Sequence, residues 1–214
     1  MRLVLVAAVL MAPIALQPQS QESQPKEMLG MPPRSAATEY QAQGQAGSIK
    51  IGAEFMEHAV PTPQATYSTE DYVVVEVGLF GPADAHLKLS MTDFALRMNG
   101  KKTPLSSEHY EIVFKSLKDP EWEPPAQDKA SKTSIGSNSG APQSDSPPPV
   151  PKMPLELRRT MEQRVQKAAL LEGERALPQA GLLFFEFRGK GKSVRSAELI
   201  YDGPAGKASL ALQP

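Results

Sequence analysis

The chain has 214 residues, 40% of them hydrophobic, and its 23 Lys and Arg against 24 Asp and Glu give a formal net charge of −1. This balance argues against a nucleic-acid-binding protein, because such proteins need an excess of Lys and Arg to neutralise phosphates. The sequence contains no cysteine, which excludes disulfides, thiolate metal sites and cysteine nucleophiles, so that the core alone must hold the fold.

The N-terminus has the pattern of a secretory signal peptide. Met1 and Arg2 precede an apolar run over 3–16, which is shorter than the roughly 20 apolar residues that a membrane-spanning helix needs. We therefore predict a signal peptide over 1–20 and an exported chain, periplasmic or extracellular, without a stable membrane span. An uncleaved N-terminal anchor is the alternative, because no small-residue cleavage motif of the usual kind stands near residue 20.

The hydrophobic content predicts a single core with long additions rather than two cores. Residues 21–47 are rich in Gln, Ser, Pro and Ala and show neither hydrophobic period, so we predict a disordered leader. Apolar residues then occupy every second position from Ile49 to Phe55, which predicts the first strand over 48–58.

The stretch 72–100 carries the clearest strand pattern. Apolar side chains at every second position of 73–79 alternate with a mixed set, which predicts a strand with one core face. Alternating runs at 87–91 and 94–98 predict two more strands. Asn99-Gly100 ends the stretch, because both residues tolerate the positive φ of a tight turn.

The chain changes character after residue 118. Before that point, alternating apolar residues predict a strand over 109–114. Residues 119–154 combine many Pro with Ser, Gly, Lys and Asp and hold almost no core residues, which predicts a disordered insert. Its run PPPVPKMP favours a polyproline II rod, which serves as a stiff linker or alternatively as a docking motif.

Residues 155–173 form the one predicted helix. Pro154 suits its first turn and Gly173 its end. An apolar stripe at helical spacing consists of Leu157, Met161, Val165 and Ala168. This stripe packs on the sandwich or, alternatively, binds a partner or a second copy.

Strands are predicted over 181–188, 197–201 and 207–212, with a turn at 202–204. The first two enclose a basic turn without an acidic residue, formed by Arg188, Lys190, Lys192 and Arg195. These cations are a possible contact for an anionic partner, or they are a solvated turn that protects a sheet edge. About eight strands, interrupted once, predict an antiparallel β-sandwich over 48–118 plus 155–214.

Five stretches carry a family resemblance: the Val-rich strand 72–77, the Ser-x-x-Asp-Phe-x-Leu stretch 90–96, the turn 99–101, Gly181-x-x-x-Phe185-x-Phe187 and Leu199-x-Tyr201. They resemble the immunoglobulin-like domains of unknown function found in exported bacterial proteins. This resemblance implies a mainly β fold, namely an immunoglobulin-like antiparallel β-sandwich of about eight strands with one inserted α-helix. It also implies an exported location and a non-enzymatic role. It carries over no functional residues, and members commonly have a short connection where this chain places 116–180.

Few residues suggest a chemical site. Met56, His58, His86 and Met91 are candidate copper ligands, because thioether and imidazole groups suit that metal, although Met filling the core and His ending strands explain them as well. No nucleophile, base or carboxylate pair shows catalytic spacing, so we predict no enzyme activity and no cofactor. The predicted function is a non-enzymatic exported interaction or scaffold module, whose partner is another exported protein or a cell-envelope component. A periplasmic copper-binding protein is the alternative.

Overall fold

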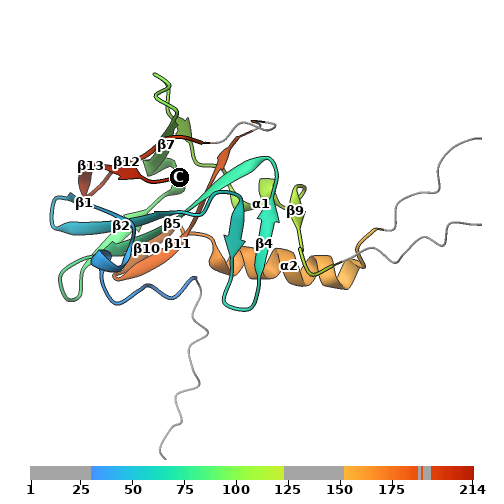
Figure 1. Ribbon diagram of the computed structural model, residues 1–214. Helices are drawn as coiled ribbons and strands as arrows, with labels where there is room; N and C mark the ends of the chain where they lie inside the picture. Colours follow the sequence, from blue (N-terminus) through green and yellow to red (C-terminus); the bar gives the residue numbers. More distant parts are fainter. Residues whose placement is uncertain (1–29, 123–151, 188, 190–193) are drawn as a thin grey trace, which may run out of the picture.

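A computed structural model describes residues 30–122, 152–187, 189 and 194–214, and Figure 1 shows how they are arranged. The predicted signal peptide, the leader up to residue 29 and residues 123–151 of the insert lie outside these ranges. The described part is mainly β and its sheets are antiparallel, as predicted. It contains thirteen strands rather than about eight, because several strands of two to four residues were not predicted.

A four-stranded sheet with the order β1-β2-β5-β11, which we call the central sheet, organises the fold. Its strands are β1 (Ala42–Ala46), β2 (Ile49–Phe55), β5 (Tyr72–Phe80) and β11 (Gln179–Glu186). β5 lies between β2 and β11, and its first eight residues are all buried. The prediction of a single core face for this strand is therefore wrong, because other parts of the chain cover both faces.

The first core lies between the central sheet and a second sheet, of order β13-β12-β7-β8. The strands of the second sheet are β7 (Phe94–Met98), β8 (Leu105–Ser106), β12 (Ala197–Gly203) and β13 (Gly206–Leu212). Val75 and Phe185 of the central sheet share this core with Leu96 and Leu199 of the second sheet. A two-stranded ribbon, β6 (His86–Leu89) with β10 (Gly173–Ala176), also contributes to it.

A second core covers the opposite face of the central sheet. Val74 and Phe184 cluster there with Met161 and Val165 of helix α2 (Leu155–Ala168), so the helix stripe packs on its own domain. The small elements of this layer are β3 (Ala59–Pro61), β4 (Thr66–Thr69), β9 (Leu117–Lys118) and α1 (Tyr110–Val113). The prediction of one core is wrong, because successive residues of β5 and β11 are apolar on both faces.

Three predicted boundaries change. Residues 30–47 were predicted to be disordered, but they contain a 3-10 turn, η1 (Ala37–Glu39), and β1, which pairs with β2. The predicted strand 109–114 contains α1 instead, because Tyr110, Val113 and Phe114 lie at helical spacing and face the second core. α2 ends at Ala168 rather than Gly173, because the backbone turns extended at Ala169 and the chain then pairs with β11.

Candidate functional site

Residues 30–40, which we call the N-terminal strap, lie over the face of the central sheet that is opposite the first core. The ring of Tyr40 lies over Gly52 and Gly78, which face each other in β2 and β5. A Cβ at Gly52 would come within 2.4 Å of the Tyr40 ring, and one at Gly78 within 2.5 Å of its hydroxyl oxygen. The two glycines thus form a slot for one aromatic ring, and burial in this slot raises the pKa of the Tyr40 hydroxyl.

An ion-pair cluster holds the strap on the sheet. Glu76 of β5 is only 6% exposed, and Arg34 donates to both of its carboxylate oxygens, at 3.3 and 3.0 Å. The same guanidinium lies 2.6 Å from Glu54 and stacks 4.3 Å from the centre of the Tyr40 ring. Since a buried carboxylate needs such a partner, this cluster is a structural element that sequence patterns missed.

Two loops meet at one end of the second sheet. Asn99 follows β7 with φ of 52°, and its side-chain oxygen accepts hydrogen bonds from the backbone N–H groups of Arg195 and Ser196, at 2.7 and 3.4 Å. Its own N–H donates to the carbonyl of Ser196 at 2.9 Å. The turn predicted at Asn99-Gly100 is therefore confirmed, and it also anchors the end of the basic turn.

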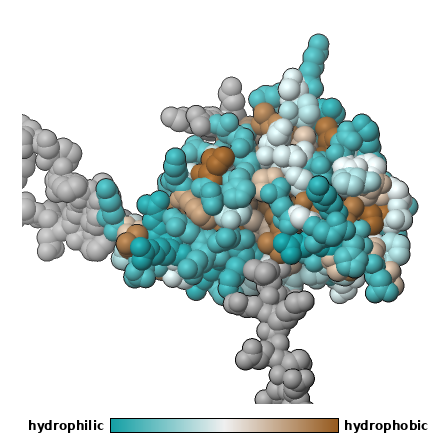
Figure 2. Space-filling model, turned by 180° about the vertical axis from the view of Figure 1, so that it is seen from behind, coloured by the Kyte–Doolittle hydropathy of each residue, from teal (hydrophilic) through white to brown (hydrophobic). Residues whose placement is uncertain are grey.

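This contact joins the loop that carries Lys101 and Lys102 to the backbone at Arg195. Lys101, Lys102 and Arg195, which we call the basic pole, are exposed, and none of them forms an ion pair with any residue that the structure describes. Figure 2 shows a narrow hydrophilic projection where Figure 1 places the loop after β7. Three of the predicted contact residues, Arg188, Lys190 and Lys192, lie outside the described residues.

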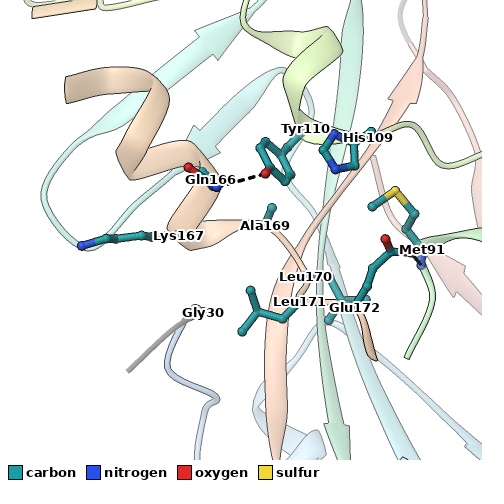
Figure 3. A pocket seen from close by; sticks show the side chains of 10 residues that line it. All are labelled: Gly30, Met91, His109, Tyr110, Gln166, Lys167, Ala169, Leu170, Leu171 and Glu172. Atoms are coloured by element: carbon teal, nitrogen blue, oxygen red, sulfur yellow. Dashed lines mark hydrogen bonds between the residues drawn. The ribbon is translucent and has the colours of Figure 1, made fainter. Parts of the chain in front are cut away.

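A cleft of about 340 Å³ lies beside the edge of β11 that does not pair with β5 (Figure 3). Three segments distant in sequence close this edge at every second residue. Met31 bridges Ala180, Leu170 donates to the carbonyl of Leu182 at 3.0 Å, and Glu108 donates to that of Phe184 at 2.7 Å. Because the cleft is lined by residues next to these contacts, its walls are anchored to the sheet by backbone hydrogen bonds.

Side-chain contacts fix both walls of the cleft. On one side the ring centres of His109 and Tyr110 lie 4.1 Å apart, and the side-chain amide of Gln166 in α2 donates to the Tyr110 hydroxyl at 3.0 Å. On the other side, one carboxylate oxygen of Glu172 accepts from the Ser90 hydroxyl and from the Met91 N–H, both at 3.1 Å. No sequence motif indicated this site, because its residues come from four separate segments.

The four candidate copper ligands lie in separate places. The Nδ1–H of His58 donates to the carbonyl of Tyr72, at the start of β5, at 2.6 Å, and Met56 lies two residues before it in the chain. His86 begins β6 and pairs with Ala176 of β10. Three residues further along the chain, Gln179 pairs with Leu79 at the other end of β5. Seven residues of strand separate these ends by roughly 23 Å. Met91 follows β6 and lines the cleft, so the structure does not bring the four side chains together.

The described residues lack two further features. Among them, no three His, Asp or Glu side chains form a group that could hold a metal ion. None of their helices has the length and apolar character needed to cross a membrane.

Comparisons with protein-family models, with curated proteins and with solved structures give no match. The fold itself defines the class of protein. It is a mainly β chain in which two antiparallel sheets share one core, and helix α2 packs on the opposite face of the central sheet.

Proposed function

We propose that this chain is an exported, non-enzymatic interaction module that contacts an anionic component of the cell envelope through its basic pole. One observation carries the proposal. Asn99 joins two loops that are 96 residues apart, so that the loop carrying Lys101 and Lys102 is bonded to the backbone at Arg195. The basic pole therefore draws its three cations from two loops that are distant in sequence.

The shape of the basic pole favours a flat partner. The loop projects as a narrow tip (Figure 2), which can touch a charged surface but cannot enclose a polymer chain. Each Lys or Arg close to an anionic membrane contributes about 1 kcal/mol, so three cations contribute about 3 kcal/mol. Anionic lipid headgroups are therefore the partner that we propose, and an acidic exported protein or an anionic polysaccharide is the competing outcome.

The fold-level part of the proposal is that the two sheets form an immunoglobulin-like sandwich. It is supported by how the chain alternates between the sheets. β5 belongs to the central sheet and β7 to the second, and the same crossing recurs from β11 to β12. Such repeated crossing is the general pattern of sandwich folds with Greek-key connections.

Co-sedimentation of the full chain with lipid vesicles tests the proposed function. Vesicles of phosphatidylcholine with one quarter phosphatidylglycerol should bind the chain, pure phosphatidylcholine should not, and added salt should weaken binding. The variant Lys101→Gln/Lys102→Gln/Arg195→Gln should bind about a hundredfold more weakly, as the loss of about 3 kcal/mol requires.

A matched control removes three exposed lysines elsewhere, in Lys50→Gln/Lys88→Gln/Lys115→Gln, and should bind like the unmodified chain. Equal binding to both kinds of vesicle would overturn the proposal. So would retention on an anionic polysaccharide such as heparin, combined with no binding to the anionic vesicles.

A further inference from the structure

The cleft beside β11 is a preformed site. Its floor follows the segment that leaves α2, where Ala169 and Leu170 are each 4% exposed and bonded to the sheet edge. The contacts of Tyr110 with Gln166, and of Glu172 with Met91, hold the two sides. A ligand would therefore find the walls in place and would not need to order them.

Three features of the cleft favour positive charge. Glu172 places a carboxylate on one side, and only one of its oxygens has a hydrogen-bond partner among the described residues. The rings of His109 and Tyr110 stack on the other side (Figure 3), and a tyrosine ring attracts cations to its face. The C-terminal end of α2 also opens on the cleft, and the last carbonyls of a helix carry partial negative charge.

From this arrangement we infer that the cleft binds an organic cation, an ammonium or guanidinium group carried on an apolar stem. The cationic head lies between Glu172 and the aromatic pair, and the stem lies against Leu171 and Met91. A volume of about 340 Å³ is at the small end of the range for ligand sites, so it accommodates one such group rather than a large ligand. This site is separate from the basic pole and does not depend on it.

Charged groups of both signs surround the cleft, and the Arg175 guanidinium donates to the backbone carbonyl of Glu172 at 3.2 Å. Burial raises the pKa of the Asp93 carboxyl, the Asp202 and Glu172 carboxylates raise it further, and a backbone hydrogen bond at Ser90 and the Lys88 ammonium lower it. Lys167 also lines the cleft, but its ammonium group points away from the space between the rings and Glu172 (Figure 3). The cleft itself therefore faces a bound cation with one carboxylate and two rings.

Titration of the isotope-labelled full chain, followed by amide NMR shifts, tests the inference. The probe is n-butylguanidinium, and its control is n-butylurea, which has the same shape without the charge. We expect saturable shifts for butylguanidinium at 91, 109–110 and 166–172, with a Kd of about 1 mM, and at least tenfold weaker binding of butylurea. Equal binding of the two compounds would overturn the inference.

Two variants separate charge from shape. Glu172→Gln keeps an oxygen that can accept from Ser90 and Met91 but removes the charge, and it should weaken butylguanidinium binding at least fivefold. Tyr110→Leu should weaken it two- to fivefold, as expected for a cation over an exposed ring. Glu174→Gln, on the neighbouring strand β10, is the matched control and should change nothing. Unchanged binding in Glu172→Gln would also overturn the inference.

A second pair of probes identifies the source of the cation. Acetyl-Gly-Arg-Gly-amide presents the guanidinium on a peptide, and its citrulline counterpart replaces that group with a neutral urea. Tighter binding of the arginine peptide than of butylguanidinium assigns the cleft to polypeptide side chains, and equal or weaker binding assigns it to small free cations. Equal binding of the arginine and citrulline peptides would contradict recognition of charge.

Discussion

Replacement of Tyr40 by alanine tests whether the strap belongs to the folded domain. Tyr40 is 3% exposed and fills the slot between Gly52 and Gly78. Truncating a buried aromatic side chain to alanine costs about 3–5 kcal/mol, and loss of the contact with the Arg34 guanidinium adds about 0.5–1 kcal/mol. Neither glycine has a side chain that could fill the gap. We therefore expect Tyr40→Ala to lower the free energy of unfolding by about 4 kcal/mol.

Tyr40→Phe is the matched control for this measurement. The Tyr40 hydroxyl is buried and has no partner at hydrogen-bonding geometry within the described part of the chain, so removing it should cost less than about 1 kcal/mol. Both variants are compared by guanidinium chloride unfolding, followed by circular dichroism. Only Tyr40→Ala should move the midpoint to lower denaturant at an unchanged slope. If Tyr40→Ala lowers the free energy of unfolding by less than about 1 kcal/mol, the reasoning is refuted. Residues 30–40 would then be a loosely attached leader.

Three further predictions concern the strap and the turn after β7. Arg34→Met leaves the Glu76 carboxylate buried without its partner and should lower the free energy of unfolding, measured by thermal unfolding, by about 3 kcal/mol. Addition of Glu76→Gln should restore more than half of this loss. No recovery would show that the buried charge is not the cause. Burial raises the pKa of both Tyr40 and Tyr201 above 10.0, so the stability that they contribute is complete below pH 10 and is lost as the pH rises through their raised pKa values. Tyr40→Phe should make the alkaline loss of stability shallower, and an unchanged pH profile would contradict this assignment. Asn99→Gly keeps the positive φ but loses the acceptor for the Arg195 N–H, which should lower the free energy of unfolding by about 1 kcal/mol. Asn99→Ala should lower it by about 1–2 kcal/mol more, because alanine also strains the backbone at this φ. Equal losses in denaturant unfolding would argue against a role for backbone strain.

Local patterns predicted the elements that a single period defines. The alternation at 94–98 matches β7, and the runs at 197–201 and 207–212 match β12 and β13. The stripe at Met161 and Val165 located α2 because apolar residues at helical spacing bury one face. In each case the apolar residues that form the sequence pattern are also the residues that pack in the core.

The strap was missed because its stability comes from residues far along the chain. Tyr40 is a single aromatic residue in a polar segment, and nothing near it in sequence shows that Gly52 and Gly78 leave a slot for its ring. Arg34 likewise reaches a carboxylate 42 residues away. α1 was misread for a different reason, since four residues are too few to distinguish a helical period from an alternating one.

The candidate sites depend on the same long-range contacts. The sequence showed Arg195 as part of a basic turn, but its connection to the loop that carries Lys101 and Lys102 became evident only from the hydrogen bond between Asn99 and Arg195. The cleft could not be predicted at all, because it exists only where β11 is bridged by segments around residues 31, 108 and 170.

The vesicle affinity of Lys101→Gln/Lys102→Gln tests the central claim most directly, because these two residues join the basic pole only through the fold. Loss of about 2 kcal/mol predicts about thirtyfold weaker binding to vesicles with one quarter phosphatidylglycerol. Lys50→Gln/Lys115→Gln, which removes the same charge elsewhere, should bind like the unmodified chain. An affinity of Lys101→Gln/Lys102→Gln equal to that of this control would contradict the account, because the two lysines would then contribute nothing to the contact.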